Sequence, residues 1–192
     1  MKALAINGSP REGGNVEILL RRALEPIFAA GHETEIVRIG GTRLRGCIAC
    51  GGCGRNRDKR CVLEDDGFNA VFAKMLEADA ILIGTPAYFA DMTADTKALI
   101  ERAGYVALAN GGLLRRKIGA AVVAARRGGA VPVMDSINHL FLMTEMIVPG
   151  STYWNYGQGL SPGDVLNDEE GLENMKNLGE QIAWLMERLR KD

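Results

Sequence analysis

Residues 3–15 read ALAINGSPREGGN, a short apolar run followed by a loop rich in glycine. The run Ala3–Ile6 predicts a buried strand, and the helical spacing of apolar residues after Asn15 predicts that a helix follows the loop. Ser9 and Arg11 supply a hydroxyl and a cation, glycines allow close backbone approach, and a helix N-terminus attracts anions. The sequence therefore predicts a phosphate loop between a strand and a helix, the alternative being a turn that binds nothing.

Several other classes of phosphate loop do not match. The loop has no Gly-Lys-Ser/Thr ending, lacks the Rossmann glycine spacing and contains no cysteine nucleophile of the kind that small tyrosine phosphatases use. Asn7 and Thr85 stand after predicted strands, where a receiver domain would need carboxylates. These absences exclude the Walker, Rossmann, tyrosine-phosphatase and receiver-domain classes.

Short apolar runs alternate with longer amphipathic segments along the rest of the chain. The expected strands are Ala3–Ile6, Thr34–Ile39, Ala80–Gly84, Ile118–Ala125 and Met146–Val148, and the expected helices are Asn15–Ala30, Gly67–Ala78, Thr93–Val106, Val131–Thr144 and Glu169–Arg190. Pro26 lies inside the first helix and is expected to bend or split it. The pattern predicts a single α/β domain over residues 1–192, with a flavodoxin-like doubly wound five-stranded parallel sheet of order 2-1-3-4-5 and helices on both faces.

Composition and charge narrow the classes of partner. The formal net charge of −1 provides no electrostatic footprint for nucleic acid or an anionic membrane. No apolar run approaches the length that spans a bilayer, and the first apolar stretch is too short for a secretory signal. We therefore expect a cytoplasmic protein with no nucleic-acid or membrane partner.

Two further loops follow predicted strands. Residues 85–93 (TPAYFADMT) place Tyr88 and Phe89 where aromatic rings can flank a planar ligand, although such residues are more often packing residues. Residues 124–129 (AARRGG) offer backbone amides and guanidinium groups, which suit the pyrimidine side of a flavin, where negative charge develops on reduction. Because the carboxyl ends of parallel strands share one edge, we expect these loops and the phosphate loop to form one site.

All four cysteines of the chain lie in a loop at residues 46–62, as Cys47, Cys50, Cys53 and Cys61. Thiolates gathered this closely favour a metal or an iron–sulfur cluster over a disulfide framework, which a cytoplasmic compartment also disfavours. Neighbouring arginines and lysines would offset cluster charge. Free or disulfide-bonded cysteines remain an alternative, and so does zinc, although zinc sites more often present two separated C-x2-C pairs.

The motifs together resemble a known family. Gly8-Ser9-Pro10-Arg11 with Gly14-Asn15, the run Thr85–Phe89 and the loop Arg127–Gly129 resemble the NAD(P)H-dependent FMN reductases of the flavodoxin-like proteins. The spacing C-x2-C-x2-C-x7-C is similar to that of the iron–sulfur flavoprotein branch. The resemblance covers nearly the whole chain, including the tail at residues 150–159.

This resemblance implies cofactors and the residues that hold them. Non-covalent FMN would place its phosphate on Ser9, Arg11, Gly13, Asn15 and Val16, and its isoalloxazine ring near Pro86, Ala87, Tyr88, Phe89, Ala125, Arg126, Arg127, Gly128 and Gly129. A four-iron, four-sulfur cluster would be held by the four cysteines. Members are typically homodimers or homotetramers with the flavin at a subunit interface.

The expected function is that of an FMN-dependent oxidoreductase that takes electrons from NAD(P)H and passes them to a small acceptor or a redox partner, through the cluster. No catalytic side chain is expected, because FMN supplies the chemistry. Two alternatives stay open: an FMN and iron–sulfur electron carrier without NAD(P)H activity, and a metal-binding module on an α/β scaffold.

Overall fold

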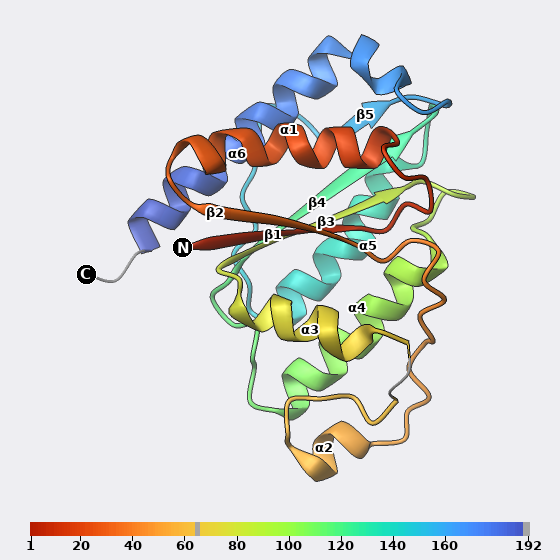
Figure 1. The fold of residues 1–192 in the computed structure, drawn as a ribbon, viewed down its shortest axis with the longest axis vertical. Helices are drawn as coiled ribbons and strands as arrows, with labels where there is room; N and C mark the ends of the chain where they lie inside the picture. Colours follow the sequence, from red (N-terminus) through yellow and green to blue (C-terminus); the bar gives the residue numbers. More distant parts are fainter. Residues whose placement is uncertain (64–65, 190–192) are drawn as a thin grey trace.

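The computed structural model describes residues 1–63 and 66–189 of the chain. Its centre is a parallel sheet in the order β2-β1-β3-β4-β5, which confirms the predicted order (Figure 1). The strands are β1 (Lys2–Asn7), β2 (Glu33–Arg38), β3 (Ala80–Pro86), β4 (Ile118–Ala125) and β5 (Tyr156–Gln158). Because side chains alternate across each strand, Ala3 and Ala5 enter one core while Leu4 and Ile6 enter the other.

Helices cover both faces of the sheet, as predicted for strands that are apolar on both sides. Figure 1 shows α1 and α6 on one face and α3, α4 and α5 on the other, with α2 lying away from the sheet. Their bounds are α1 (Asn15–Ala29), α2 (Gly52–Asn56), α3 (Phe68–Glu77), α4 (Ala94–Ala109), α5 (Ala130–Met143) and α6 (Glu169–Leu189), with a 3-10 turn at Asp164–Asn167. The last residue of the helix predicted to end at Arg190 lies outside the described residues.

The predicted fifth strand is wrong. Of Met146–Val148, only Ile147 pairs with the sheet, through an isolated bridge to Ile118 at the start of β4. The chain then leaves the sheet at Pro149, which has no N–H for a ladder, and returns as β5 beside the end of β4. The carboxyl end of β4, where the site lies, is therefore covered by Tyr156–Gln158 and not by the apolar run.

Of the two effects expected of Pro26, a split of the first helix is wrong, since α1 runs as one element to Ala29, and a bend stays a prediction. Pro26 stands in the last turn, where the missing N–H removes one helical bond shortly before the helix ends. The Pro26 carbonyl accepts the N–H of Ala30 at 3.0 Å.

Among the described residues, no helix combines the length and the apolar character that a membrane crossing demands.

Candidate functional site

The three predicted loops meet at the carboxyl edge of the sheet, around a cavity of about 170 Å³. Eight of the predicted flavin residues line it: Ser9, Arg11, Asn15, Val16, Pro86, Ala87, Tyr88 and Arg126. The predicted residues Gly13, Phe89, Ala125, Arg127, Gly128 and Gly129 are not among the lining residues. Ala124, Gly159 and Leu160 complete the wall. The cavity joins segments from both ends of the sequence in one site.

Backbone hydrogen bonds tie the segments around this cavity to one another. They run from Gly8 N–H to Gly84 O, from Ala87 N–H to Ala124 O and from Gly159 N–H to Ala125 O, with N···O distances of 2.7, 2.9 and 3.0 Å. Each bond joins a loop to the end of a neighbouring strand. The shape of the cavity is therefore set largely by main-chain pairing.

The phosphate loop keeps the helix N-terminus open. Gly14 is the N-cap of α1 and provides no side-chain cap, so the first N–H groups of the helix have no intrahelical partner. Glu17 reaches back to accept the Gly13 N–H at 3.0 Å. The hydrogen bonds from Arg21 and Gly13 lower the pKa of Glu17, which keeps this carboxylate ionised. The loop is thus held in place while the helix end stays available to an anion.

Asn15 fastens the chain after β5 to the start of α1. Its amide nitrogen donates to Ser161 O at 3.0 Å, and its amide oxygen accepts the N–H of Gly163 at 2.9 Å. Arg11 adds a bond from Nη1 to Leu160 O at 2.7 Å. The two side chains therefore build the wall that residues 159–165 form, and phosphate binding by them stays a prediction.

The loop after β3 makes a tight turn beside the cavity. Tyr88 and Asp91 exchange backbone hydrogen bonds, and both Phe89 and Ala90 between them have positive φ, a conformation that non-glycine residues rarely adopt. The turn directs Phe89 into solvent, where it is fully exposed. Gly129 has φ +88°, and a β-carbon there would lie 3.1 Å from Ala90 Cα, so the loops after β3 and β4 pack directly together.

The four cysteines line a second cavity, of about 130 Å³, between the cysteine loop and α4. The other lining residues come from the loop, and from α4 as Arg102, Tyr105 and Val106. All four cysteines are free thiols, with Cys50 exposed and the others half-buried. The topology therefore brings the predicted ligands to one place, and none of them forms a disulfide.

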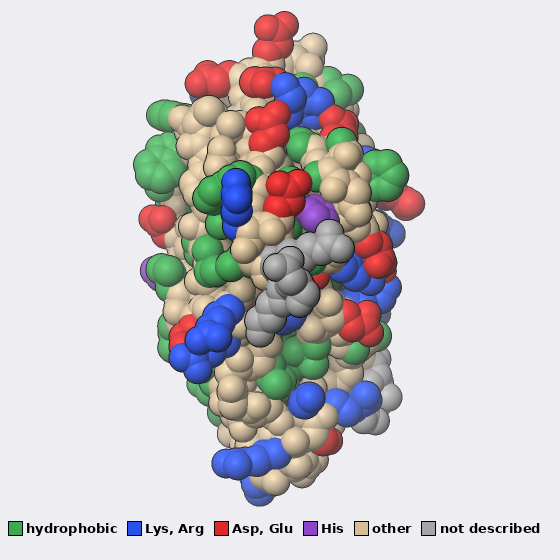
Figure 2. All heavy atoms as spheres, turned by 90° about the vertical axis from the view of Figure 1, so that its left-hand side faces the viewer, with side chains coloured by type: hydrophobic (Ala, Val, Ile, Leu, Met, Phe, Trp, Pro, Cys, Tyr) green, Lys and Arg blue, Asp and Glu red, His purple; other side chains and the backbone are tan. Residues whose placement is uncertain are grey.

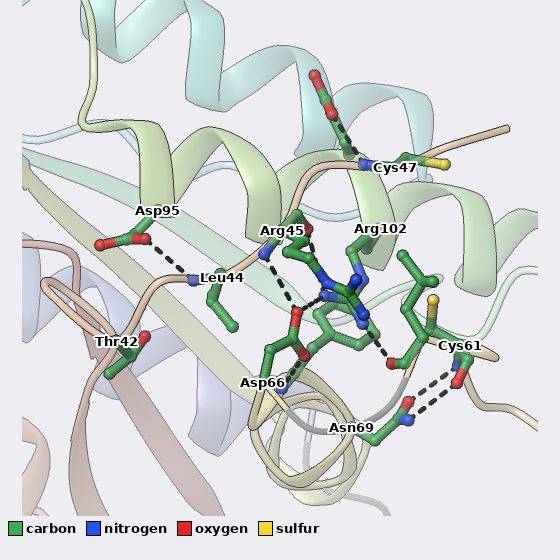
Figure 3. Close-up of polar contacts among 12 residues, drawn as sticks. Thr42, Leu44, Arg45, Cys47, Cys61, Asp66, Asn69, Asp95 and Arg102 are labelled. Carbon is green, nitrogen blue, oxygen red and sulfur yellow. Dashed lines mark hydrogen bonds and ion pairs between the residues drawn. The ribbon is translucent and has the colours of Figure 1, made fainter.

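A neighbouring side chain binds the backbone of each cysteine. Glu101 accepts the Cys47 N–H at 3.2 Å, Arg55 donates to Cys50 O at 2.8 Å, Asn110 donates to Cys53 O at 3.4 Å, and Asn69 pairs with both backbone groups of Cys61 at 2.9 Å. Figure 3 shows the bonds to Cys47 and Cys61. Sequence reasoning treated Arg55 only as a charge beside the thiols. It missed Glu101, Asn110 and Asn69, because nothing in the pattern separates them from ordinary surface residues of helices and loops.

The cysteine cavity is roomier than a single ion requires. Its volume corresponds to about four water molecules. Within residues 1–63 and 66–189, no group of three or more cysteine, histidine or acidic side chains is placed to hold a single metal ion.

One helix supports both cavities. Thr93, the N-cap of α4, donates from its hydroxyl to Gly8 O at 2.9 Å. The backbone N–H of Thr93 donates to Thr85 Oγ1 at 3.1 Å. Arg102, which lines the cysteine cavity, lies about 14 Å further along the helix axis, at 1.5 Å per residue. The α4 helix therefore begins at the phosphate loop and ends beside the thiols.

Comparisons of sequence and structure identify similar proteins. The profile of the family described as NADPH-dependent FMN reductase matches residues 1–161. An iron-sulfur flavoprotein of Methanocaldococcus jannaschii is 37% identical over the full length of both chains, and one of Methanosarcina thermophila is 32% identical over all of this chain and 98% of its own. The flavodoxin-like WrbA-like protein from Agrobacterium tumefaciens has a TM-score of 0.68 at 14% identity, covering 98% of both chains, which shows the shared fold.

Proposed function

The chain belongs to the NADPH-dependent FMN reductase family, and from this premise we propose that it oxidises NAD(P)H with bound FMN and passes the electrons onward through an iron–sulfur cluster. Membership makes the protein an FMN-dependent flavoprotein of the oxidoreductase class. The electron donor, the cluster and the acceptor are the proposed parts.

The convergence of three loops on one cavity is the observation that carries the proposal. The open N-terminus of α1 and the guanidinium of Arg11 suit a phosphate, because both present positive charge to the same region. Tyr88 and Arg126 line the cavity from the loops after β3 and β4, where an aromatic face and a cation suit a flavin ring. These are the residues that would hold FMN.

FMN supplies the redox chemistry when bound, since it accepts a hydride from a nicotinamide and can release electrons singly. The residues of the chain have the task of binding, orienting and tuning. The cavity is lined by one tyrosine and by no carboxylate or histidine among the described residues. This lining supports a site in which no side chain acts as general acid or base.

The cluster is supported by the arrangement of the thiols. Cys47, Cys50, Cys53 and Cys61 are the residues that would hold four irons, and they line one cavity without disulfides. A cluster there would accept and donate single electrons. The relatives' names support the same assignment, since both are called iron-sulfur flavoproteins.

We also propose that the protein assembles as a homodimer or homotetramer and that it passes electrons to a small-molecule or protein acceptor. The large exposed side chains of Tyr153 and Trp154 lie on one segment beside β5, and Phe89 projects from the rim of the FMN cavity. Such side chains suit contact with a second copy. Sedimentation at several protein concentrations tests the assembly, and a monomer throughout would contradict it.

Anaerobic purification followed by absorption spectroscopy, flavin extraction and iron and sulfide counts tests the cofactors. We expect one FMN per chain together with about four irons and four sulfides. Stopped-flow mixing with NADH and with NADPH then tests the donor, with bleaching of the flavin band expected for at least one. Protein that takes up no FMN would overturn the FMN site, and protein with one zinc and no sulfide would overturn the cluster.

An FMN and iron–sulfur electron carrier is the second candidate, because the curated relatives are named for their cofactors and not for a reductase activity. The same stopped-flow experiment separates the two functions. A carrier would show a flavin band that dithionite bleaches and neither nicotinamide affects.

A further inference from the structure

Arg102 is a buried charge at the base of the cysteine loop. It stands in α4 and is 1% exposed. Its Nη1 donates to Arg45 O at 3.2 Å, and its Nη2 donates to Leu63 O at 2.7 Å. Arg45 precedes the first cysteine by two residues and Leu63 follows the last by two. One guanidinium therefore joins the two ends of the loop that carries all four thiols (Figure 3).

The surrounding groups fix this guanidinium in one position. Asp66 forms an ion pair with Nη1 and also accepts the N–H groups of Arg45 and Phe68 at 3.1 and 3.2 Å. The Phe68 ring lies 4.1 Å from the guanidinium carbon. Burial raises the pKa of Asp66, but the hydrogen bonds from Arg102 and the two N–H groups outweigh it, so the pKa is lowered and the pair stays charged.

One donor of the guanidinium is left over. Arg102 Nε is buried and has no hydrogen-bond partner among the described residues, although the side chain lines the cysteine cavity. An unpaired buried donor is destabilising, because it loses its hydrogen bond to water on folding. An acceptor that reached Nε from the cavity would satisfy this donor, and the cavity lining includes all four cysteines.

We propose that Arg102 is the positioning residue of the iron–sulfur site: it closes the cysteine loop at both ends and supplies the buried positive charge and spare N–H donor that tune a cluster held there. The inference rests on the cluster of the proposed function and names a residue outside the cysteine motif. Charge and hydrogen bonds to sulfur set cluster potentials, so a fixed cation beside the thiolates favours the reduced cluster. No other described Arg or Lys lines this cavity.

Two single variants separate the geometric role from the electrostatic one. Arg102→Lys keeps the charge but loses the planar fork that reaches two carbonyls at once. Arg102→Gln keeps a hydrogen-bond donor but removes the charge. We expect both variants to lose the cluster to a chelator about 10-fold faster than the wild-type protein. We expect the midpoint potential of the cluster to fall in Arg102→Gln and to stay near the wild-type value in Arg102→Lys.

Arg102→Gln leaves Asp66 as a buried carboxylate without its cation, which is a folding risk. The double variant Arg102→Gln/Asp66→Asn removes both charges and should therefore fold more easily. Its potential should fall less than in Arg102→Gln, because the compensating carboxylate is lost together with the cation. Arg57→Gln is the matched control for chelator release and for hydrogen exchange, because Arg57 is an exposed arginine on the same loop. FMN content checks folding in every variant, since the FMN cavity is built from other segments.

Hydrogen exchange provides a readout that does not depend on the cluster's activity. Amides of residues 45–63 should exchange about 10-fold faster in both Arg102 variants than in the wild-type protein and in Arg57→Gln, with exchange in the strands unchanged. Wild-type chelator resistance and an unchanged potential in Arg102→Gln would overturn the inference. Wild-type protein without iron and sulfide would instead overturn the proposed function, so the two failures are distinguishable.

Discussion

The FMN cavity and the cysteine cavity are held by different kinds of bond. Backbone pairing at the ends of parallel strands joins the segments around the FMN cavity. Side chains hold the cysteine loop instead, and many of them belong to α4 or to the start of α3. The FMN cavity should therefore survive most single side-chain substitutions, whereas the cysteine cavity depends on a few buried polar residues.

The charges near the two cavities differ as well. Figure 2 shows Lys and Arg side chains gathered at the lower end of the molecule, around the region that α2 occupies in Figure 1. Arg55, Arg57 and Lys59 are exposed there. A nearly neutral protein thus concentrates positive charge beside its thiols, where a cluster would carry negative charge.

Loss of Asp66 should break the cysteine cavity most severely. Asp66→Ala removes the partner of a buried arginine, and leaving one charge of such a pair costs about 3–5 kcal/mol. We expect denaturant unfolding to report this loss, with faster exchange at residues 45–63 and FMN uptake retained. Asp135→Ala, at an exposed position of α5, is the control. If Asp66→Ala lost FMN while residues 45–63 kept the wild-type exchange rate, the FMN cavity would be the more fragile of the two.

The same pair makes the loop sensitive to acid. Because the pKa of Asp66 is below its ordinary value of 3.8 in the folded protein, its contribution is present above that value and is lost as the pH falls through the folded pKa. Exchange at residues 45–63 should therefore accelerate below about pH 4 in the wild-type protein. Asp66→Asn should flatten this dependence, and an unchanged profile would contradict the assignment.

A substitution that displaces the backbone around the FMN cavity should weaken FMN binding. Gly40 follows β2, and a β-carbon there would overlap the carbonyl group of Ser9 in the phosphate loop. Gly40→Ala should cost about 2–3 kcal/mol and raise the dissociation constant of FMN at least tenfold, as measured by fluorescence titration. Gly150→Ala, where a β-carbon meets nothing within 4 Å, is the matched control. Normal FMN affinity in Gly40→Ala would show that the phosphate loop adapts freely.

Asn15 tests whether side chains also shape the FMN cavity. Asn15→Ala removes the bonds that fasten residues 161–163 to α1, which should cost about 1–2 kcal/mol of unfolding free energy and weaken FMN about tenfold. The exposed Asn167, changed to alanine, is the control. Equal FMN affinity in the two variants would mean that backbone pairing alone maintains the cavity.

Glu17 should give the smallest effect. Glu17→Gln weakens the bond to the Gly13 N–H and removes the ion pair with Arg21, for about 0.5 kcal/mol. The lowered pKa of Glu17 means that its contribution is present above the ordinary value of 4.5 and fades as the pH falls through the folded pKa. The melting temperatures of the wild-type protein and Glu17→Gln should differ less at pH 3 than at pH 7.

Local patterns were enough for most of the fold. The limits Ile118–Ala125 of β4 were predicted to the residue, because a central parallel strand is apolar on both faces. The fifth strand was misplaced because Met146–Val148 is apolar and Tyr156–Gln158 is short and contains glycine. Judged by hydropathy, Met146–Val148 is the better strand candidate, but Tyr156–Gln158 pairs with β4. The reason is that pairing beside β4 depends on how the chain returns to the sheet edge.

The same limit applies to side chains. His32 follows a helix-ending glycine and looks like a surface residue, yet it is 6% exposed. Arg102 looks like an ordinary helical arginine until the fold packs α4 against the cysteine loop. Burial of a polar side chain is a property of the neighbours it meets, and these are distant in the sequence.

The sequence by itself determined the class of fold, the glycine-rich loop between β1 and α1 and the grouping of the four cysteines, because each follows from residues that are neighbours along the chain. The tertiary structure decided which strand closes the sheet, that residues 159–165 wall the FMN cavity, and that α4 supports both cavities. These features depend on contacts between segments as much as about 150 residues apart, such as Asn15 with Val165, and local propensity carries no information about them.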